Sequence, residues 1–408
     1  MTSSTAADPQ SGAVLSPLRL KKREERRLRA GHLWVYSNEV DTAATPLSDF
    51  QPGQPVQIQA HNGKALGCGY VNPHSLICAR LVSRDPVQLL DRSLLVHRLN
   101  VALSLRQRLF DAPCYRLVHG EGDALPGLVV DRFGDVLVVQ LTTAGMERVK
   151  EQVVDALERV LKPRGILVRN DTPIRAMEGL DSYVESLGDV PSSVEVLENG
   201  ARFQTPLSGG QKTGWFYDQR ENRARMTHYA KDCRVLDLFS YVGAWGIQAA
   251  RAGATEVHCV DASQAALDAV AVNAERNGVA STVHPVQGDA FAVLKELRDG
   301  REHFDVVILD PPAFIKRRKD LDAGVEAYHR LNQMAMQVLS RDGVVISASC
   351  SFHLETQRLQ RILLQCARHL DRSLQLLDRG RQSPDHPVHP AIAETEYLKA
   401  LYCRVLPA

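Results

Sequence analysis

The stretch VLDLFSYVGAWG, residues 235–246, decides the fold of this chain. A short apolar run ends in Asp237, a turn follows, and a helix rich in small residues begins. An open parallel sheet has its ligand crevice at the carboxyl ends of its strands, so Asp237 is expected at that edge. Gly243 and Gly246 would let backbone approach a ligand closely. Because the G-x-G-x-x-G pattern is absent and an acid is present, the stretch favours a ligand with cationic or hydroxyl groups over a dinucleotide.

Further apolar runs follow this stretch, and regions of helical character separate them. They span residues 256–260, 283–287, 304–309 and 343–349. Alternation of strands and helices predicts an α/β domain built on a doubly wound, Rossmann-like parallel sheet. The residues at or just after the strand ends are polar or nucleophilic in each case: Asp261, Asp289, Asp310 and Cys350.

The acids at the strand ends suit S-adenosylmethionine, which carries an ammonium, a sulfonium and a ribose. Asp261 ends the second strand, where an acid accepts hydrogen bonds from both ribose hydroxyls of a nucleotide. Asp289 and Ala290 are expected at the adenine edge. The alternative, in which each acid is only a helix N-cap, accounts for one acid better than for a series. The strand ends and the first loop therefore provide these predicted cofactor-binding residues: Asp237, Phe239, Ser240, Gly243, Asp261, Asp289 and Ala290.

The segment before the first strand, residues 211–223 (QKTGWFYDQRENR), is unusually dense in aromatic, amide and charged residues. Its aromatic rings could sandwich a purine. The polar residues Asp218, Gln219 and Arg220 are predicted to contact the amino-acid end of the cofactor. The alternative is the start of an amphipathic helix with one aromatic residue in the core, and both interpretations can hold at once.

The composition is that of a soluble globular protein with two or three domains in 408 residues. The net charge is +1, so any surface that binds a polyanion must be local. Eight cysteines are scattered without a close C-x-x-C pair, so we expect neither a metal site nor disulfides. No apolar run reaches the roughly 20 residues that span a bilayer, and the start lacks a signal-peptide pattern. We therefore expect a cytoplasmic protein with no membrane partner.

The chain divides into a disordered start and three domains, at residues 1–17, 18–84, 85–197 and 198–408. In the central domain, helical periodicity at 91–110 and 146–161 accompanies two strands within 128–139. This pattern predicts an α+β domain, and we find no catalytic constellation in it.

The first domain combines short strand-like runs with one basic helix, which predicts a small all-β module. The helix from Arg19 to Arg29 has seven positive and two negative residues, a net charge of +5 (7 − 2). Aromatic residues follow it closely. We interpret this cluster as a surface for nucleic-acid phosphates, and the alternative is an ordinary solvated helix face. The predicted RNA contacts are Lys21, Lys22, Arg26, Arg27 and Trp34.

With these residues assembled, the chain resembles the RlmI-type family of ribosomal RNA cytosine-5 methyltransferases. The resemblance implies an N-terminal, β-barrel-like PUA domain that binds RNA, a central α+β domain and a C-terminal class I methyltransferase domain. It also implies a cytosine of 23S ribosomal RNA as substrate and S-adenosylmethionine as methyl donor. Members of the family often form homodimers, so a homodimer is one expected oligomeric state. The motifs that carry it are GHLWVY (31–36), GDALPGL (122–128), DRFG (131–134), KTGWFYDQR (212–220), the 235–246 stretch, DPPAF (310–314), SCS (349–351) and DHPV (385–388).

The chemistry of cytosine methylation calls for a nucleophile, because carbon 5 does not attack a methyl sulfonium directly. A thiolate that adds to carbon 6 makes carbon 5 enamine-like. Cys350 ends the fifth strand and is the predicted nucleophile, although a lone cysteine in an apolar strand is ordinarily a small core residue. Asp310 is predicted to hold the cytosine amino group or ring nitrogen 3. The DPPAF loop lacks a second cysteine, so the base that removes the carbon-5 proton is unassigned.

The residues after the DPP turn are expected to meet the RNA. Phe314 would stack on the target base, which must be flipped out or single-stranded to reach Cys350. Lys316 and Arg317 would bind phosphates, and the alternative is again a solvated charge run.

Two other functions stay open at this level. One is a methyltransferase that acts on a guanine exocyclic amine or on protein, in which Cys350 is structural. The other is a non-catalytic RNA-binding protein that retains a cofactor-type fold.

Overall fold

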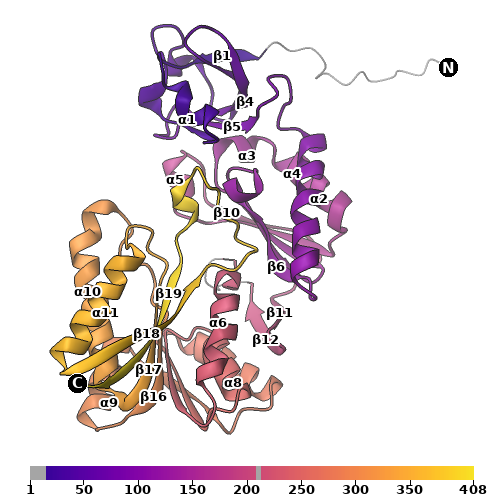
Figure 1. Cartoon of the computed structure of the whole chain (residues 1–408). Coiled ribbons are helices and arrows are strands. Elements are labelled where there is room, and N and C mark those ends of the chain that lie inside the picture. The colour runs from indigo at the N-terminus through magenta and orange to yellow at the C-terminus, as the bar shows by residue number, and fades with distance from the viewer. Residues whose placement is uncertain (1–14, 208–212) are drawn as a thin grey trace.

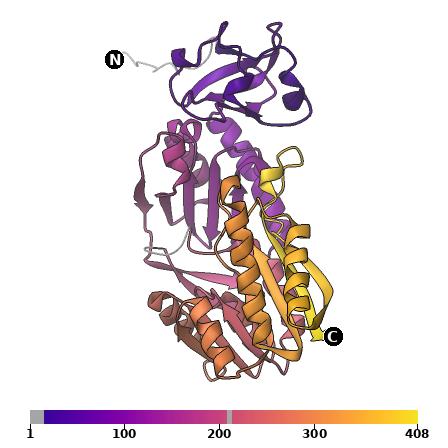
Figure 2. The ribbon, with the colours of Figure 1, turned by 90° about the vertical axis from the view of Figure 1, so that its left-hand side faces the viewer.

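The computed structural model describes residues 15–207 and 213–408, and it stacks the three domains end to end (Figure 1, Figure 2). The N-terminal domain is a curled five-stranded sheet in the order β1-β3-β4-β5-β2 with one short helix. Its elements are β1 (Ser16–Arg19), α1 (Glu25–Arg29), β2 (Trp34–Val35), β3 (Gln54–Gln59), β4 (Ala65–Val71) and β5 (Ala79–Ser83).

The predicted basic helix is much shorter than expected. Residues 16–19 form a strand because Leu18 and Leu20 alternate into the core, and both are fully buried. A turn with Arg23 at a positive φ of 76° separates this strand from the five residues of α1. Ser16 and Pro17, which we expected in the disordered start, therefore belong to the sheet, and residues 1–14 of that start lie outside the described residues.

The central domain is a five-stranded sheet in the order β10-β9-β8-β7-β6, covered on one face by α2 and α4. The predicted helix at 91–110 is confirmed as α2. The helix predicted at 146–161 starts at a Thr143 cap and breaks at Val149. The elements are α2 (Arg92–Leu109), β6 (Cys114–His119), β7 (Leu128–Phe133), β8 (Val136–Leu141), α3 (Ala144–Arg148), α4 (Lys150–Leu161), β9 (Gly165–Asn170), α5 (Ile174–Met177) and β10 (Tyr183–Gly188).

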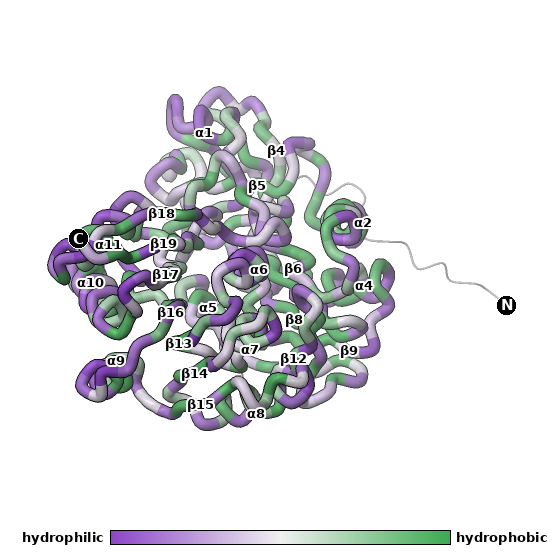
Figure 3. The backbone as a smooth tube through the Cα atoms, turned by 60° about the horizontal axis from the view of Figure 1, so that its bottom comes forward, coloured by the Kyte–Doolittle hydropathy of each residue, from purple (hydrophilic) through white to green (hydrophobic). Residues whose placement is uncertain are grey.

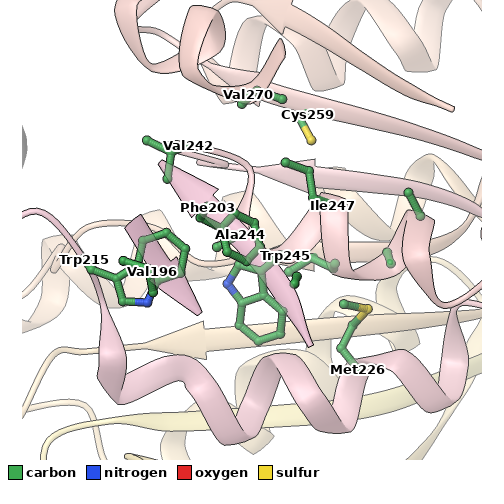
Figure 4. Packing of buried hydrophobic residues seen from close by; sticks show 14 of the residues in the cluster. Val196, Phe203, Trp215, Met226, Val242, Ala244, Trp245, Ile247, Cys259 and Val270 are labelled. Carbon is green, nitrogen blue, oxygen red and sulfur yellow. The ribbon is translucent and has the colours of Figure 1, made fainter. Parts of the chain in front are cut away.

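A hairpin of β11 (Ser193–Glu198) and β12 (Ala201–Pro206) joins the central and C-terminal domains. Val196 and Phe203 from this hairpin pack with Trp215 and Trp245 in one apolar cluster (Figure 4). The predicted boundary after residue 197 therefore falls inside a hairpin that contributes to the C-terminal core.

The C-terminal domain is a seven-stranded sheet in the order β15-β14-β13-β16-β17-β19-β18. Its five predicted strands are parallel, and helices cover both faces, so the doubly wound sheet is confirmed. Figure 3 shows apolar residues concentrated along these strands and polar residues at the periphery. The strands are β13 (Arg234–Leu238), β14 (Glu256–Asp261), β15 (Val283–Gln287), β16 (Phe304–Leu309), β17 (Leu339–Ser349), β18 (Arg372–Arg381) and β19 (Lys399–Pro407). The helices are α6 (Arg220–Met226), α7 (Ala244–Arg251), α8 (Gln264–Arg276), α9 (Ala290–Asp299), α10 (Leu321–Gln337) and α11 (Thr356–His369).

The last two strands were not predicted, and their connection, residues 382–398, reaches the central domain (yellow in Figure 1). Arg106 donates a 2.7 Å hydrogen bond to the Asp385 carbonyl, and the Arg116 amide donates a 2.9 Å bond to the Asp385 carboxylate. Gly122 lies so close to Pro387 that a Cβ there would be 2.0 Å from its carbonyl oxygen. Two of the quoted motifs, GDALPGL and DHPV, thus form a contact between domains.

Within the described residues, no helix has both the length and the apolar character needed to cross a membrane.

Candidate active site

A cavity of about 580 Å³ opens at the carboxyl ends of the parallel strands, where the crevice of such a sheet is expected. Residues at the end of β14 and directly after β16 and β17 meet there with the loop after β13 and the segment before α6. Nine of the predicted site residues line it: Asp218, Gln219, Phe239, Ser240, Asp261, Asp289, Ala290, Asp310 and Cys350.

The loop after β13 lines the cavity and has a strained backbone. Phe239 and Tyr241 have positive φ angles of 65° and 50°, which are uncommon for bulky residues and cluster at functional sites. Two hydrogen bonds hold the loop in this shape: the Ser240 amide donates to the Val260 carbonyl at 3.0 Å, and the Tyr241 amide donates to the Asp261 carboxylate at 2.9 Å. The second strand end therefore orients the first loop.

Gly243 and Asp237 support the loop from beneath and do not line the cavity. Gly243 has φ 83°, and a Cβ there would be 3.0 Å from Ile247 and 3.2 Å from Val270, so it lets α7 pack closely on α8. Asp237 is 0% exposed and accepts a 2.9 Å bond from the Gly246 amide in the first turn of α7. Burial raises the pKa of Asp237 to about 8. Direct cofactor contacts from these two residues, as predicted, do not fit their placement.

Asp261 and Asp289 lie at the cavity wall. Asp261 accepts a second 2.9 Å bond, from the Ser263 amide, which completes a tight turn. Asp289 caps α9 by accepting from the Phe291 and Ala292 amides at 3.0 and 3.2 Å. The N-cap interpretation is therefore correct for Asp289, and the same carboxylate also lines the cavity.

Asp310 is fixed by two donors. Gln219 donates from Nε2 to Oδ1 at 2.8 Å, and Trp245 donates from Nε1 to Oδ2 at 3.0 Å. Burial raises the pKa of Asp310 despite these donors. The Gln219 side chain, predicted to contact the cofactor, is thus engaged in positioning Asp310, and its Oε1 accepts from Asn222 at 2.6 Å. Trp245 stands in the 235–246 stretch, but its role was not predicted.

Asp218 is paired with a residue from a distant part of the chain. The Tyr397 hydroxyl donates to its Oδ2 at 2.6 Å, and both residues line the cavity. Burial, together with the nearby Asp218 carboxylate, raises the pKa of Tyr397 well above its usual value. No local pattern in the sequence pointed to Tyr397, which lies in the β18–β19 connection.

The motif Ser349-Cys350-Ser351 divides its side chains between the core and the cavity. Both serine hydroxyls lie at hydrogen-bond distance from the hydroxyl of Tyr328 on α10. The distance is 2.8 Å for Ser349 and 3.1 Å for Ser351. Cys350, between the two, faces the cavity. This alternation at the end of β17 agrees with the prediction of an accessible thiol.

Arg220 and Phe314 do not line the cavity, so their contacts with the cofactor and the target base stay predictions. Arg220 donates to the Cys114 carbonyl, and its guanidinium lies 4.2 Å from the centre of the Phe110 ring. Phe314 is partly buried and packs against Tyr328 of α10, with ring centres 4.9 Å apart, at the edge of the apolar cluster. Arg220 also lies 3.6 Å from the buried Glu198 carboxylate. Gln211 and Lys212, quoted in the segment before α6, lie outside the described residues.

The predicted RNA contacts fall into two groups. Lys21, Lys22, Arg26, Lys316 and Arg317 are exposed, although Lys21 donates to the Asn38 carbonyl and Arg317 pairs with Asp320 at 3.3 Å. Arg27 and Trp34 are engaged within the protein: Arg27 pairs with Glu39 at 2.8 Å, and the Trp34 indole donates to Glu121 at 2.8 Å. The Trp34 bond links the N-terminal and central domains. Arg27 and Trp34 therefore have structural contacts, and their contacts with RNA stay predictions.

Within the described parts of the chain, no group of three or more His, Cys, Asp and Glu residues is arranged to hold a metal ion.

Comparison with known proteins agrees with this architecture. Residues 18–84 match the PUA-like domain family, and residues 115–404 match the S-adenosylmethionine-dependent methyltransferase family. Ribosomal RNA large subunit methyltransferase I of Aliivibrio fischeri (strain MJ11) is 36% identical over 393 residues, which covers 95% of this chain and 98% of that protein. The protein of the same name from Erwinia tasmaniensis is 37% identical over the same shares.

Solved structures share the fold over almost the whole chain. A putative SAM-dependent methyltransferase from Streptococcus mutans has a TM-score of 0.80 at 22% identity and covers 96% of this chain and 100% of that one. A putative methyltransferase complexed with SAH has a TM-score of 0.82, with the same identity and coverage. These structures confirm the fold. The matching sequence families confirm the predicted PUA-like and methyltransferase domains and the cofactor S-adenosylmethionine. The chain belongs to the ribosomal RNA large subunit methyltransferase I family of S-adenosylmethionine-dependent methyltransferases.

Proposed function

We propose that this protein methylates carbon 5 of a cytosine in large-subunit ribosomal RNA through a covalent adduct with Cys350. One observation carries the proposal: Cys350 and Asp310, at the ends of adjacent strands, face the same cavity as Asp261 and Asp289. A nucleophile, a group that can hold the base and a set of cofactor acceptors therefore share one space. The names of the curated relatives supply the substrate class.

The cavity fits S-adenosylmethionine, which supplies an electrophilic methyl group when bound. Asp261 offers a carboxylate for the ribose hydroxyls. The Phe216 and Tyr241 rings, 5.7 Å apart and perpendicular, offer apolar surface for the purine beside Asp289. The buried Ser240 hydroxyl lines the cavity without a hydrogen-bond partner among the described residues, which suits a polar ligand atom.

The reaction divides into addition, methyl transfer and elimination. The Cys350 thiolate bonds to carbon 6, and the electron pair moves to carbon 5, which then accepts the methyl group. Asp310 accepts from the exocyclic amine, or donates to ring nitrogen 3 when protonated, and its raised pKa favours the protonated form. Loss of the carbon-5 proton to a base then expels the thiolate and restores the aromatic ring.

The deciding experiment maps methylated nucleosides by mass spectrometry in 23S ribosomal RNA from cells with and without this protein. We expect one 5-methylcytosine to disappear with the protein and to return when it is re-expressed. Loss of an N-methylguanine instead would favour exocyclic-amine methylation, and an unchanged profile with intact cofactor binding would favour a non-catalytic RNA-binding protein.

Replacing Asp261 with Ala is expected to weaken S-adenosylmethionine binding about 10- to 150-fold, because a hydrogen bond to a charged group contributes about 1.5–3 kcal/mol. Calorimetric titration measures this directly. Asp261→Asn, which keeps an acceptor but loses the charge, should fall between the parent and Asp261→Ala. The control Asp268→Ala changes an exposed acid on the neighbouring helix and should leave affinity unchanged. Equal affinities for Asp261→Ala and the control would remove Asp261 from the cofactor site.

Replacing the exposed Lys22, Arg26 and Lys316 with Ala is expected to reduce RNA affinity and its salt dependence. Removing one cation that binds a phosphate lowers the slope of log K against log salt by about 0.7–0.9. Arg27 is left intact because it pairs with Glu39. A control that replaces the exposed Lys231 and Lys295 removes charge elsewhere on the C-terminal domain. If both variants show the parent slope, these residues form only a solvated face.

A further inference from the structure

Lys399 is a buried lysine beside the predicted nucleophile. It is the first residue of β19 and pairs in register with Ser349 of β17, the residue before Cys350. It is 7% exposed. Its ammonium donates to the Ser351 carbonyl at 2.7 Å and to the Leu354 carbonyl at 2.8 Å. Both acceptors belong to the loop that directly follows Cys350, so Lys399 holds this loop against the end of the sheet.

The charge of Lys399 has no carboxylate at bonding distance. None of the ion pairs found within residues 15–207 and 213–408 includes it. Burial lowers the pKa of its ammonium to about 8, while Cys350 and Glu396 act in the opposite direction. A buried cation without an anionic partner is costly. An anion at Cys350 would offset that cost, since the thiol is one of the two groups that favour the charged lysine.

We propose that the Lys399 ammonium is the counter-charge that holds Cys350 as a thiolate, ready to attack carbon 6. This inference rests on the proposed function and deepens it by naming the residue that activates the nucleophile. A cysteine beside a lysine commonly ionises below its usual range, and the thiolate is the reactive form. The thiol proton leaves to water, and no other bond changes.

The other ionisable groups that face this site do not supply the charge. Tyr328 on α10 and Tyr397 before β19 both interact electrostatically with Cys350. Burial raises the pKa of each phenol, so both are neutral near pH 7. Asp218 lines the cavity, and its carboxylate would oppose a thiolate. Asp310 also lines the cavity, and its raised pKa favours the neutral acid, which supplies no counter-charge. Arg223 also lines it, but its guanidinium is paired with Glu198 at 2.5 Å.

The test measures the pH dependence of Cys350 alkylation by iodoacetamide, with mass spectrometry of the Cys350 peptide. It needs neither RNA nor cofactor. Cys233 is the other partly exposed cysteine among the described residues and serves as an internal reference, since burial raises the pKa of its thiol. In the parent protein we expect the Cys350 midpoint to lie below about pH 7.5. A midpoint at or above about 8.5, the ordinary thiol value, overturns the proposal by itself.

Three variants separate the charge from the hydrogen bonds. Lys399→Met and Lys399→Gln should both raise the midpoint by about one unit or more, toward an ordinary thiol, and Lys399→Arg should keep it low. A purely structural lysine predicts the opposite ranking: Lys399→Gln, which keeps N–H donors for the loop, would behave as the parent. Lys295→Met makes the same change at an exposed site and should shift nothing. Thermal melting shows whether each variant is folded. If Lys399→Met does not fold, Lys399→Gln decides the test by itself.

Failure of this inference is distinguishable from failure of the proposed function. A low parent midpoint that Lys399→Gln raises supports the pair even if no 5-methylcytosine is found in the ribosomal RNA. An unshifted midpoint refutes the pair even if the methylation map is positive.

Discussion

Cys350→Ala is expected to lower methyl transfer to RNA by about 10³-fold or more, because removal of a covalent nucleophile eliminates the pathway it opens. Cofactor affinity should change little, since the thiol is expected to bond to the base. The assay follows transfer of a labelled methyl group from S-adenosylmethionine to RNA. Cys233→Ala removes a partly exposed thiol outside the cavity and should retain full activity.

A trapping experiment tests the covalent bond itself. An RNA that carries 5-fluorocytosine at the target position cannot lose a proton from carbon 5, so the adduct should persist after methyl transfer. Denaturing gels should show a protein–RNA band with the parent enzyme and with Cys233→Ala, and none with Cys350→Ala. A Cys350→Ala enzyme that still methylates would make the thiol a packing residue and favour an exocyclic-amine methyltransferase.

Glu198→Ala is expected to destabilise the protein by about 3–5 kcal/mol, because removal of one partner leaves a buried charge unpaired. The Glu198 side chain is fully buried and accepts from Arg223 at 2.5 Å, from the Trp215 indole at 2.9 Å and from Gln248 at 3.0 Å. Arg220 lies 3.6 Å away. Because Arg223 and Trp215 line the cavity, the same change should also weaken cofactor binding.

The measurement is the free energy of unfolding from urea titration, followed by tryptophan fluorescence. Glu195→Ala is the matched control: it lies on the same strand, is partly exposed, and pairs with Arg202 and Arg276 on the surface. Exposed pairs contribute about 0–1 kcal/mol, so Glu195→Ala should cost little. Similar losses for the two variants would contradict a structural role for the buried Glu198 cluster.

Local pattern was enough to predict the parallel sheet and much of the cavity. Each strand is an apolar run that ends in a polar residue, and parallel strands bring such ends to one edge whatever the loops do. Asp261, Asp289, Asp310 and Cys350 therefore reach the same cavity. The helix α2 was equally readable, because one face of a long helix repeats at a regular spacing.

The sequence pattern did not predict the direction in which individual side chains point. Asp237, in β13, is directed at the start of α7, and Gly243, in the loop, lies against Ile247 and Val270, so neither lines the cavity. Arg220 and Phe314 stand next to cavity residues along the chain, yet Arg220 lies between Glu198 and the Phe110 ring, and Phe314 packs against Tyr328. Adjacent residues on a strand face opposite sides, so the side chain one position along the chain can face the core instead of the cavity.

The sequence by itself determined the order of the five parallel strands and the edge where their polar ends meet, including the end that carries Cys350, because these depend on patterns within about ten residues. Only the tertiary structure decided what surrounds that cysteine. Tyr397 and Lys399 reach the site because β19 inserts antiparallel between β17 and β18, a pairing that joins residues about fifty positions apart. Such non-local pairing leaves no periodic trace in either segment, so the sequence did not reveal that Tyr397 pairs with Asp218 or that Lys399 binds the loop after Cys350.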